Sequence, residues 1–277
     1  MVGIEIILDQ GISLLMVMAR VGGIFAISPL MSGNAVPLRV KTFMTLFFGL
    51  AAFAALPGDW RTPPDMTLAE VGVWAVREVM IGVAIGFIAS LPITAAQLVG
   101  QVTGYQMGLA LAQAFNPATD ANSGVFEGLM FYVAVGVFVT MGGLEALLMI
   151  VLESFSSAPP AGMGVERLPM ETVVAVLGSG FEMAIRGSAP VVGIIMIETV
   201  ASAVLMRTIP QVNIMSVGFA IKIVLASIVL ASAIAGVAAL IHVEFESALE
   251  LALGWVRSLG EGGGAGAGGR ASAGGAV

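Results

Sequence analysis

Long apolar runs alternate with short polar breaks along this chain, and an apolar run of about 20 residues can cross a bilayer as a helix. The pattern predicts about six hydrophobic helical segments, over residues 12–31, 42–56, 68–114, 126–152, 172–206 and 214–241. Pro92 lies inside the long third segment. Because proline lacks a backbone N–H, we expect a kink or break there. The predicted fold is therefore all-α, built of helical hairpins, with its third segment long and broken.

The polar breaks carry turn and cap signals. Residues 57–66 hold three prolines and mixed charge, which is typical of a loop. Thr67 follows, and Glu70 three residues later predicts a capping box at the start of the third segment. From residue 260 onward the chain is mostly Gly, Ala and Ser, which favours a disordered tail. We therefore expect one helical domain over residues 1–259 and a tail over residues 260–277.

Composition points to a membrane protein. The chain has 277 residues, of which 58% are hydrophobic and only 10% charged, whereas a soluble domain carries about 25% charged residues. The net charge of −7 and the scattered basic residues argue against nucleic-acid binding. The chain has no cysteine and a single histidine, so disulfides, thiolate metal sites and a metal centre are not expected. No catalytic motif stands in a credible context, and we expect neither an enzyme nor a cofactor.

The stretch GQVTGYQMGLALAQAFNP at residues 100–117 is the most unusual part of the chain. Gly100, Gly104 and Gly108 recur every four residues, a spacing that lets helices approach closely in a membrane. Four glutamines run through or beside the same stretch: Gln97, Gln101, Gln106 and Gln113. Amides in hydrocarbon need partners, so they either bond to neighbouring helices or face water.

A polar loop follows Asn116 and Pro117. Its polar residues are Thr119, Asp120, Asn122 and Ser123. The ordinary interpretation is a surface turn between two helices. The alternative is a loop tucked into a conduit, because irregular backbone at membrane depth is tolerated when it is buried in protein or faces a cavity.

Charged residues inside apolar runs are candidates for function. They include Arg20 and Glu78. Most of the set lie near predicted segment ends, where snorkelling to the membrane surface explains them. Glu198 and Lys222 lie in or near the fifth and sixth segments, and we expect them to form a buried ion pair across that hairpin.

Four stretches together resemble the FliR family of flagellar biosynthesis proteins, called the SctT family in injectisomes. They are RVGGIFAISPLMSGNAVPLRVK, REVMIGVAIGF, QLVGQVTGYQMGLALAQAFNPAT and IPQVNIMSVGFAIKI, and the resemblance covers nearly the whole chain except the tail. The family usually has Asp-Pro where this chain has Asn116 and Pro117. That difference removes one charge and keeps a residue type that favours turns.

The resemblance implies a role in the export gate of the type III secretion apparatus, in the bacterial inner membrane at the flagellar basal body. It implies assembly with FliP-like and FliQ-like subunits and an FlhB-like protein into a closed helical cone, in contact with membrane lipids and with unfolded exported proteins. The loop near residues 110–123 would plug the conduit, with Phe115, Asn116 and Pro117 at its centre, and the four glutamines would face the lumen. No nucleic acid is implied.

Two other functions stay open on sequence alone. An injectisome gate subunit that exports effectors would show the same motifs. A secondary transporter of a small solute would use broken helices around a midplane site, and Pro92 and the break at residues 209–213 fit that pattern, although no internal symmetry is visible.

Overall fold

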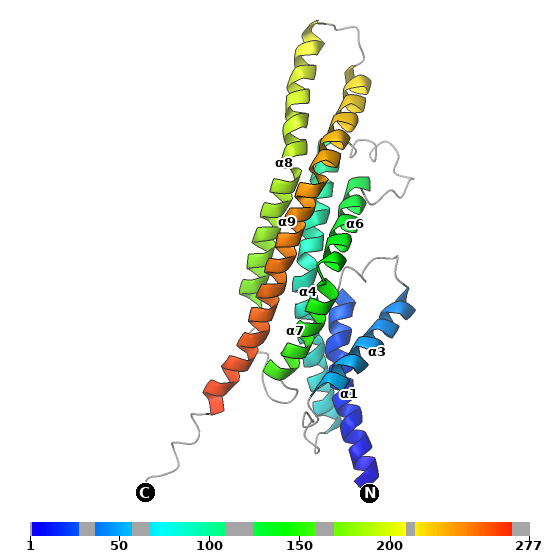
Figure 1. Ribbon diagram of the computed structural model, residues 1–277, viewed down its shortest axis with the longest axis vertical. Helices are drawn as coiled ribbons and strands as arrows, with labels where there is room; N and C mark the ends of the chain where they lie inside the picture. Colours follow the sequence, from blue (N-terminus) through cyan, green and yellow to red (C-terminus); the bar gives the residue numbers. More distant parts are fainter. Residues whose placement is uncertain are drawn as a thin grey trace, which may run out of the picture. The chain divides into compact units, whose positions relative to one another are not determined.

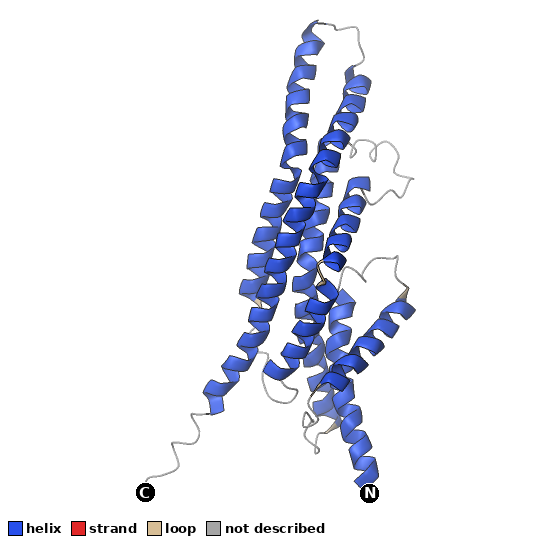
Figure 2. Ribbon diagram, in the orientation of Figure 1, coloured by secondary structure: helices blue, strands red, loops and turns tan. Residues whose placement is uncertain are grey.

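The structure, a computed structural model, describes residues 2–27, 37–56, 67–108, 124–158, 169–208 and 214–267 (Figure 1). These residues form seven helices. In chain order they are α1 (Val2–Ile27), α3 (Leu38–Ala55), α4 (Leu68–Gln106), α6 (Val125–Thr140), α7 (Gly143–Ser157), α8 (Met170–Thr208) and α9 (Ile214–Ala267). Within the described ranges there is no strand (Figure 2). The prediction of an all-α fold is confirmed.

Four of the helices are long and apolar enough to cross a membrane, judged by length and composition. The candidate spans are Gln10–Ile27 in α1, Leu68–Gln106, Met170–Leu205 in α8 and Gly218–Gly260 in α9. Helices α6 and α7 pass the same test as a bent pair, which raises the number to five. The described part of the chain thus agrees with a helical membrane protein of about the predicted number of segments.

Of the kink or break predicted at Pro92, the break is not observed, because α4 runs through that residue without interruption. Pro92 removes one N–H from the helix, which leaves the carbonyl four residues earlier without its usual donor. Ser90 Oγ donates to the Phe87 carbonyl at 2.6 Å, one residue before the carbonyl that loses its donor.

The break lies instead in the fourth predicted segment, which the sequence pattern treated as one helix. Helix α6 ends at Thr140 and α7 begins at Gly143, with Gly142 in the left-handed region at φ 77°. Glycine adopts that conformation without steric cost. Thr140 Oγ1 donates back to the Gly136 carbonyl at 2.9 Å, so the end of α6 keeps its polar groups bonded. Hydropathy does not reveal such a break, because every residue around it is apolar or small.

The capping box at the start of α4 is confirmed. Thr67 N–H donates to Glu70 Oε2 at 2.7 Å, and Glu70 N–H donates to Thr67 Oγ1 at 3.4 Å. At the other end of the chain α9 extends to Ala267. Residues 268–277 lie outside the described residues, and the division into a domain over 1–259 and a tail stays a prediction.

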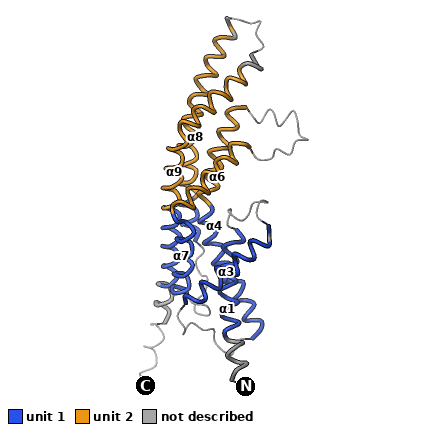
Figure 3. The backbone as a smooth tube through the Cα atoms, turned by 45° about the vertical axis from the view of Figure 1, so that its right-hand side comes forward, with its two compact units in different colours: residues 1–90, 142–176, 247–277 blue, residues 91–141, 177–246 orange. Residues whose placement is uncertain are grey.

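The chain divides into two compact units, coloured separately in Figure 3. Unit 1 comprises residues 1–90, 142–176 and 247–277, and unit 2 comprises residues 91–141 and 177–246. Both units depend on glycines that admit a neighbouring backbone. In unit 1, a Cβ on Gly82 would overlap the Arg20 carbonyl oxygen of α1, and a Cβ on Gly86 would lie 2.6 Å from the Ile24 carbonyl oxygen. These two α4 glycines therefore pack directly against the α1 backbone.

Candidate functional site: the carboxyl-terminal half of α4 and two buried ion pairs

The carboxyl-terminal half of α4, within unit 2, carries the predicted site. One side of this segment is buried, and its residues include Ala96, Val99, Thr103 and Met107. Gln97 and Gln101 are half-buried and lie one helical turn apart. Gln101 Nε2 donates to the hydroxyl of Tyr105, which is 58% exposed. The two amides therefore share a face that is neither fully packed nor purely apolar.

The remaining glutamines differ in position. Gln106 is exposed and is the last residue of α4. It does not share the face of Gln97 and Gln101, since five residues along a helix turn the side chain well away from that face. Gln113 lies outside the described residues. A common orientation of all four glutamines toward a lumen stays a prediction.

The three glycines of the stripe meet different surroundings. Gly100 is buried, and a Cβ on it would overlap the Phe126 carbonyl oxygen of α6 and approach the Glu127 Cα to 2.7 Å. Gly104 is half-buried. Gly108 lies just past the helix end with φ 79°, and its N–H donates to the Tyr105 carbonyl at 3.0 Å. Gly100 thus lies at a backbone contact between α4 and α6, whereas Gly108 has the left-handed geometry common after a helix end.

The predicted plug residues all lie outside the described residues: Phe115, Asn116, Pro117, Thr119, Asp120, Asn122 and Ser123. The described chain resumes at Gly124, which precedes the first residue of α6.

The structure brings Glu198 of α8 close to Lys222 of α9. Lys222 Nζ lies 3.7 Å from Glu198 Oε2, with the Glu198 side chain 4% and the Lys222 side chain 28% exposed. Ser202 Oγ donates to Glu198 Oε1 at 2.5 Å. Among the described residues, Glu198 Oε2 is buried and accepts no hydrogen bond. This pair is close enough to attract but is incompletely hydrogen-bonded.

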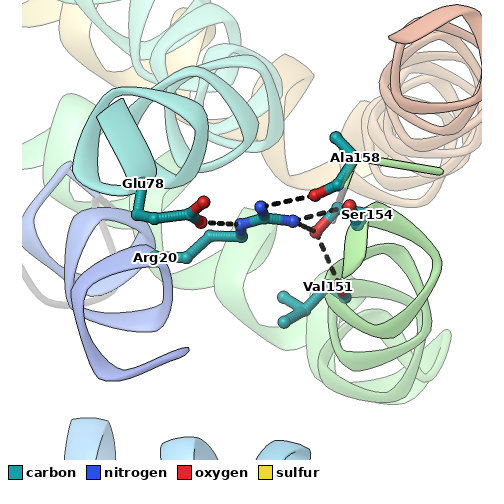
Figure 4. Close-up of polar contacts among 5 residues, drawn as sticks. All are labelled: Arg20, Glu78, Val151, Ser154 and Ala158. Carbon is teal, nitrogen blue, oxygen red and sulfur yellow. Dashed lines mark hydrogen bonds and ion pairs between the residues drawn. The ribbon is translucent and has the colours of Figure 1, made fainter. Parts of the chain in front are cut away.

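A second and tighter ion pair lies in unit 1 (Figure 4). Arg20 Nε donates to Glu78 Oε2 at 2.5 Å, and their side chains are 0% and 2% exposed. Snorkelling, which was the explanation for most charges in apolar runs, does not apply to these two side chains, because both are buried. Their partners come from α1, α4 and the carboxyl end of α7 in unit 1. The signal that could have found them is their residue type, since opposite charges in two apolar helices are stable when they pair.

Among the described residues, no three His, Cys, Asp or Glu side chains lie together in a way that could hold a metal ion.

Helices that can cross a membrane, close glycine contacts between them and charges paired within apolar surroundings define a polytopic helical membrane protein. Residues 12–248 match the model of the family described as bacterial export proteins, family 1. The match covers most of the chain, and the chain belongs to this family.

Relatives occur in more than one secretion setting. The chain is 27% identical over 205 residues to the flagellar biosynthetic protein FliR of Escherichia coli (strain K12), covering 72% of this chain and 76% of the relative. It is 27% identical over 229 residues to FliR of Bacillus subtilis (strain 168), covering 81% and 86%. It is also 28% identical over 196 residues to the secretion system apparatus protein SsaT of Salmonella typhimurium, covering 69% and 74%.

Proposed function

We propose that this chain is a subunit of the flagellar type III protein export gate and helps to form the closed conduit through which unfolded flagellar subunits leave the cell. The observation that carries the proposal is the family match over residues 12–248, together with similarity to FliR proteins over about three quarters of both chains. The role is structural, and chemistry on the substrate is not part of it.

The conduit is proposed to run beside the carboxyl-terminal half of α4. Supporting this, Gln97 and Gln101 share a face with the exposed Tyr105, while Gly100 brings α4 against the α6 backbone. Amides on one side of a tightly packed apolar helix suit a wet surface between subunits. In this arrangement residues 110–123, which we call the plug segment, close the lumen with Phe115, Asn116 and Pro117.

The proposed partners are FliP-like and FliQ-like subunits and an FlhB-like protein in the bacterial inner membrane. Affinity purification of the tagged chain from its native membrane, followed by intact-complex mass measurement, tests this part. One large particle containing such proteins is expected. A monomer, or a homo-oligomer without them, would contradict the proposal.

Deletion of residues 118–123 tests the plug segment. We expect the complex to assemble with unchanged composition and the membrane to become leaky to ions or small molecules, because the deletion shortens the segment that fills the lumen. Deletion of the six residues 270–275 from the terminal stretch serves as the length-matched control and is expected to leave permeability unchanged. Normal permeability in an assembled complex lacking residues 118–123 would refute the plug role.

A second candidate is an injectisome gate subunit that exports effectors. It is favoured by the similarity to SsaT and by 21% identity over 204 residues to the surface presentation of antigens protein SpaR of Salmonella typhimurium. Deleting the gene in its native host separates the two candidates. Loss of filament export with intact effector secretion supports the flagellar gate, and the opposite result supports the injectisome.

A further inference from the structure

Arg20 connects three helices of unit 1 from a site with no exposed surface. Its Nε donates to Glu78 of α4, as described above. One terminal nitrogen donates to the Ser154 carbonyl at 2.6 Å and to Ser154 Oγ at 2.9 Å, and the other donates to the Ala158 carbonyl at 2.8 Å (Figure 4). The guanidinium also lies 4.0 Å from the centroid of the Phe155 ring. Two of its four hydrogen bonds and the ring contact go to α7, and a third bond goes to Ala158, the residue that follows this helix.

The carboxyl end of α7 is a favourable place for a positive charge. The last carbonyls of a helix have no partner within the helix and carry a partial negative charge. Helix α7 ends at Ser157, and the residue after it, Ala158, has φ −131° and ψ 80° rather than the left-handed glycine that ends many helices. The Ser154 carbonyl already accepts the Ala158 N–H at 3.0 Å, and the Arg20 guanidinium bonds to it as well as to the Ala158 carbonyl just beyond the helix. Arg20 thus brings a positive charge from another helix to this end of α7.

Glu78 lowers the free-energy cost of burying the Arg20 charge on α1. A buried arginine without a counter-ion is strongly unfavourable, and the carboxylate neutralises it. The two helices are held close at the same level, because Gly82, one turn after Glu78, lies under the Arg20 carbonyl oxygen. The carboxylate therefore occupies a set position from which it orients the guanidinium toward α7.

We propose that Arg20 and Glu78 form an internal latch that holds the carboxyl end of α7 on α1 and α4, and that the latch specifically requires arginine. Lysine has the charge but lacks the planar arrangement of donors that reaches Glu78, Ser154 and Ala158 at once. The inference concerns the conformation of unit 1 and is independent of the proposed export function.

Thiol labelling measures the latch directly, since the chain has no cysteine of its own. A single reporter, Val151→Cys, is placed on α7, where the native side chain is 5% exposed. The matched control is Ala52→Cys on α3 in the same unit, where the native side chain is 0% exposed. In membranes containing the full-length protein, the labelling rate by a membrane-permeant maleimide reports how often each helix opens.

Two changes to the latch are compared in both reporter backgrounds. Arg20→Lys keeps the charge, whereas the double change Arg20→Met and Glu78→Leu removes both charges and leaves no buried ion unpaired. We expect either change to speed labelling of Val151→Cys by about a hundredfold, the effect of losing several charge-assisted hydrogen bonds. Labelling of Ala52→Cys is expected to stay within about twofold, because α3 packs mainly against α1 and has no group among the hydrogen-bond partners of Arg20 that the structure describes.

The other outcomes overturn the proposal. Unchanged labelling of Val151→Cys would show that Arg20 does not hold α7. Equal acceleration of both reporters by Arg20→Lys would show that the pair supports the whole unit rather than one helix. A third result is that Val151→Cys labels in the Arg20→Lys protein at the same rate as in the protein with Arg20, and faster only in the double variant. That result would show that a positive charge at residue 20 is sufficient and that arginine is not required.

Discussion

In each compact unit, one ion pair joins two helices through a buried carboxylate, and these two pairs are built differently. In unit 1, Arg20 and Glu78 are both almost fully buried, 2.5 Å apart, and the arginine has further partners on α7. In unit 2, Lys222 lies 3.7 Å from Glu198 and keeps 28% of its side chain exposed. A buried charge needs a complete set of partners, whereas a partly exposed lysine can reach polar surroundings with its ammonium group. The comparison predicts that unit 1 is far more sensitive to loss of its pair.

The largest effect is expected for Glu78→Leu. This change leaves Arg20 buried without its counter-ion and should lower the free energy of unfolding by about 3–5 kcal/mol. Denaturant unfolding of the detergent-solubilised protein, followed by tryptophan fluorescence, measures it. Glu198→Leu is the matched change in unit 2, and an equal or larger loss there would reverse the comparison.

The two units are expected to lose similar stability when the glycines at their helix contacts are replaced. Gly82→Ala in unit 1 and Gly100→Ala in unit 2 each force a methyl group against a carbonyl oxygen of another helix, at an expected cost of about 1–3 kcal/mol. Gly128→Ala is the control, since a Cβ there meets nothing within 4 Å, and it should be neutral or slightly stabilising. Thermal unfolding midpoints compare the three variants. A cost at Gly128 equal to that at Gly100 would disprove the close-contact explanation.

The pair in unit 2 should show a smaller coupling. Glu198→Gln and Lys222→Met, measured singly and together, are expected to give an interaction free energy of about 1 kcal/mol. If the pair also matters for assembly, each single variant lowers the yield of the assembled complex and the double variant recovers it. Independent, additive effects on both readouts would show that the 3.7 Å approach has no energetic consequence.

The smallest effect is expected for Glu182 and Arg186, which form an ion pair one turn apart on α8 with side chains 60% and 65% exposed. Arg186→Gln should change the free energy of unfolding by no more than about 0.5 kcal/mol, because exposed pairs are weakened by water. This variant sets the baseline for the two buried pairs. A loss above that of Lys222→Met would mean that exposure is a poor guide to the strength of these pairs.

Several features followed from local sequence alone. Hydropathy placed the helices, with α8 observed at Met170–Thr208 where a segment over 172–206 was predicted. The capping box at Thr67 and Glu70 formed as its spacing indicated. Such features depend on residues within one or two helical turns of each other, so tertiary packing changes them little.

Other features required the tertiary structure. Pro92 stays within a continuous helix although proline usually disrupts one, and the real break falls at Gly142, where backbone conformation rather than hydropathy is decisive. The sequence shows that residues 82 and 100 are glycines. It does not show which carbonyl oxygen of a neighbouring helix each of them contacts.

The sequence by itself determined the class of protein, the helices and the family, because apolar length and motif order are properties of the linear chain. Only the tertiary structure decided which charges are paired. Arg20, Glu78 and Ser154 are far apart in the chain, and their interaction depends on how closely three helices approach. The free energy of a buried charge is set by the partners around it, and those partners exist only once the helices have packed.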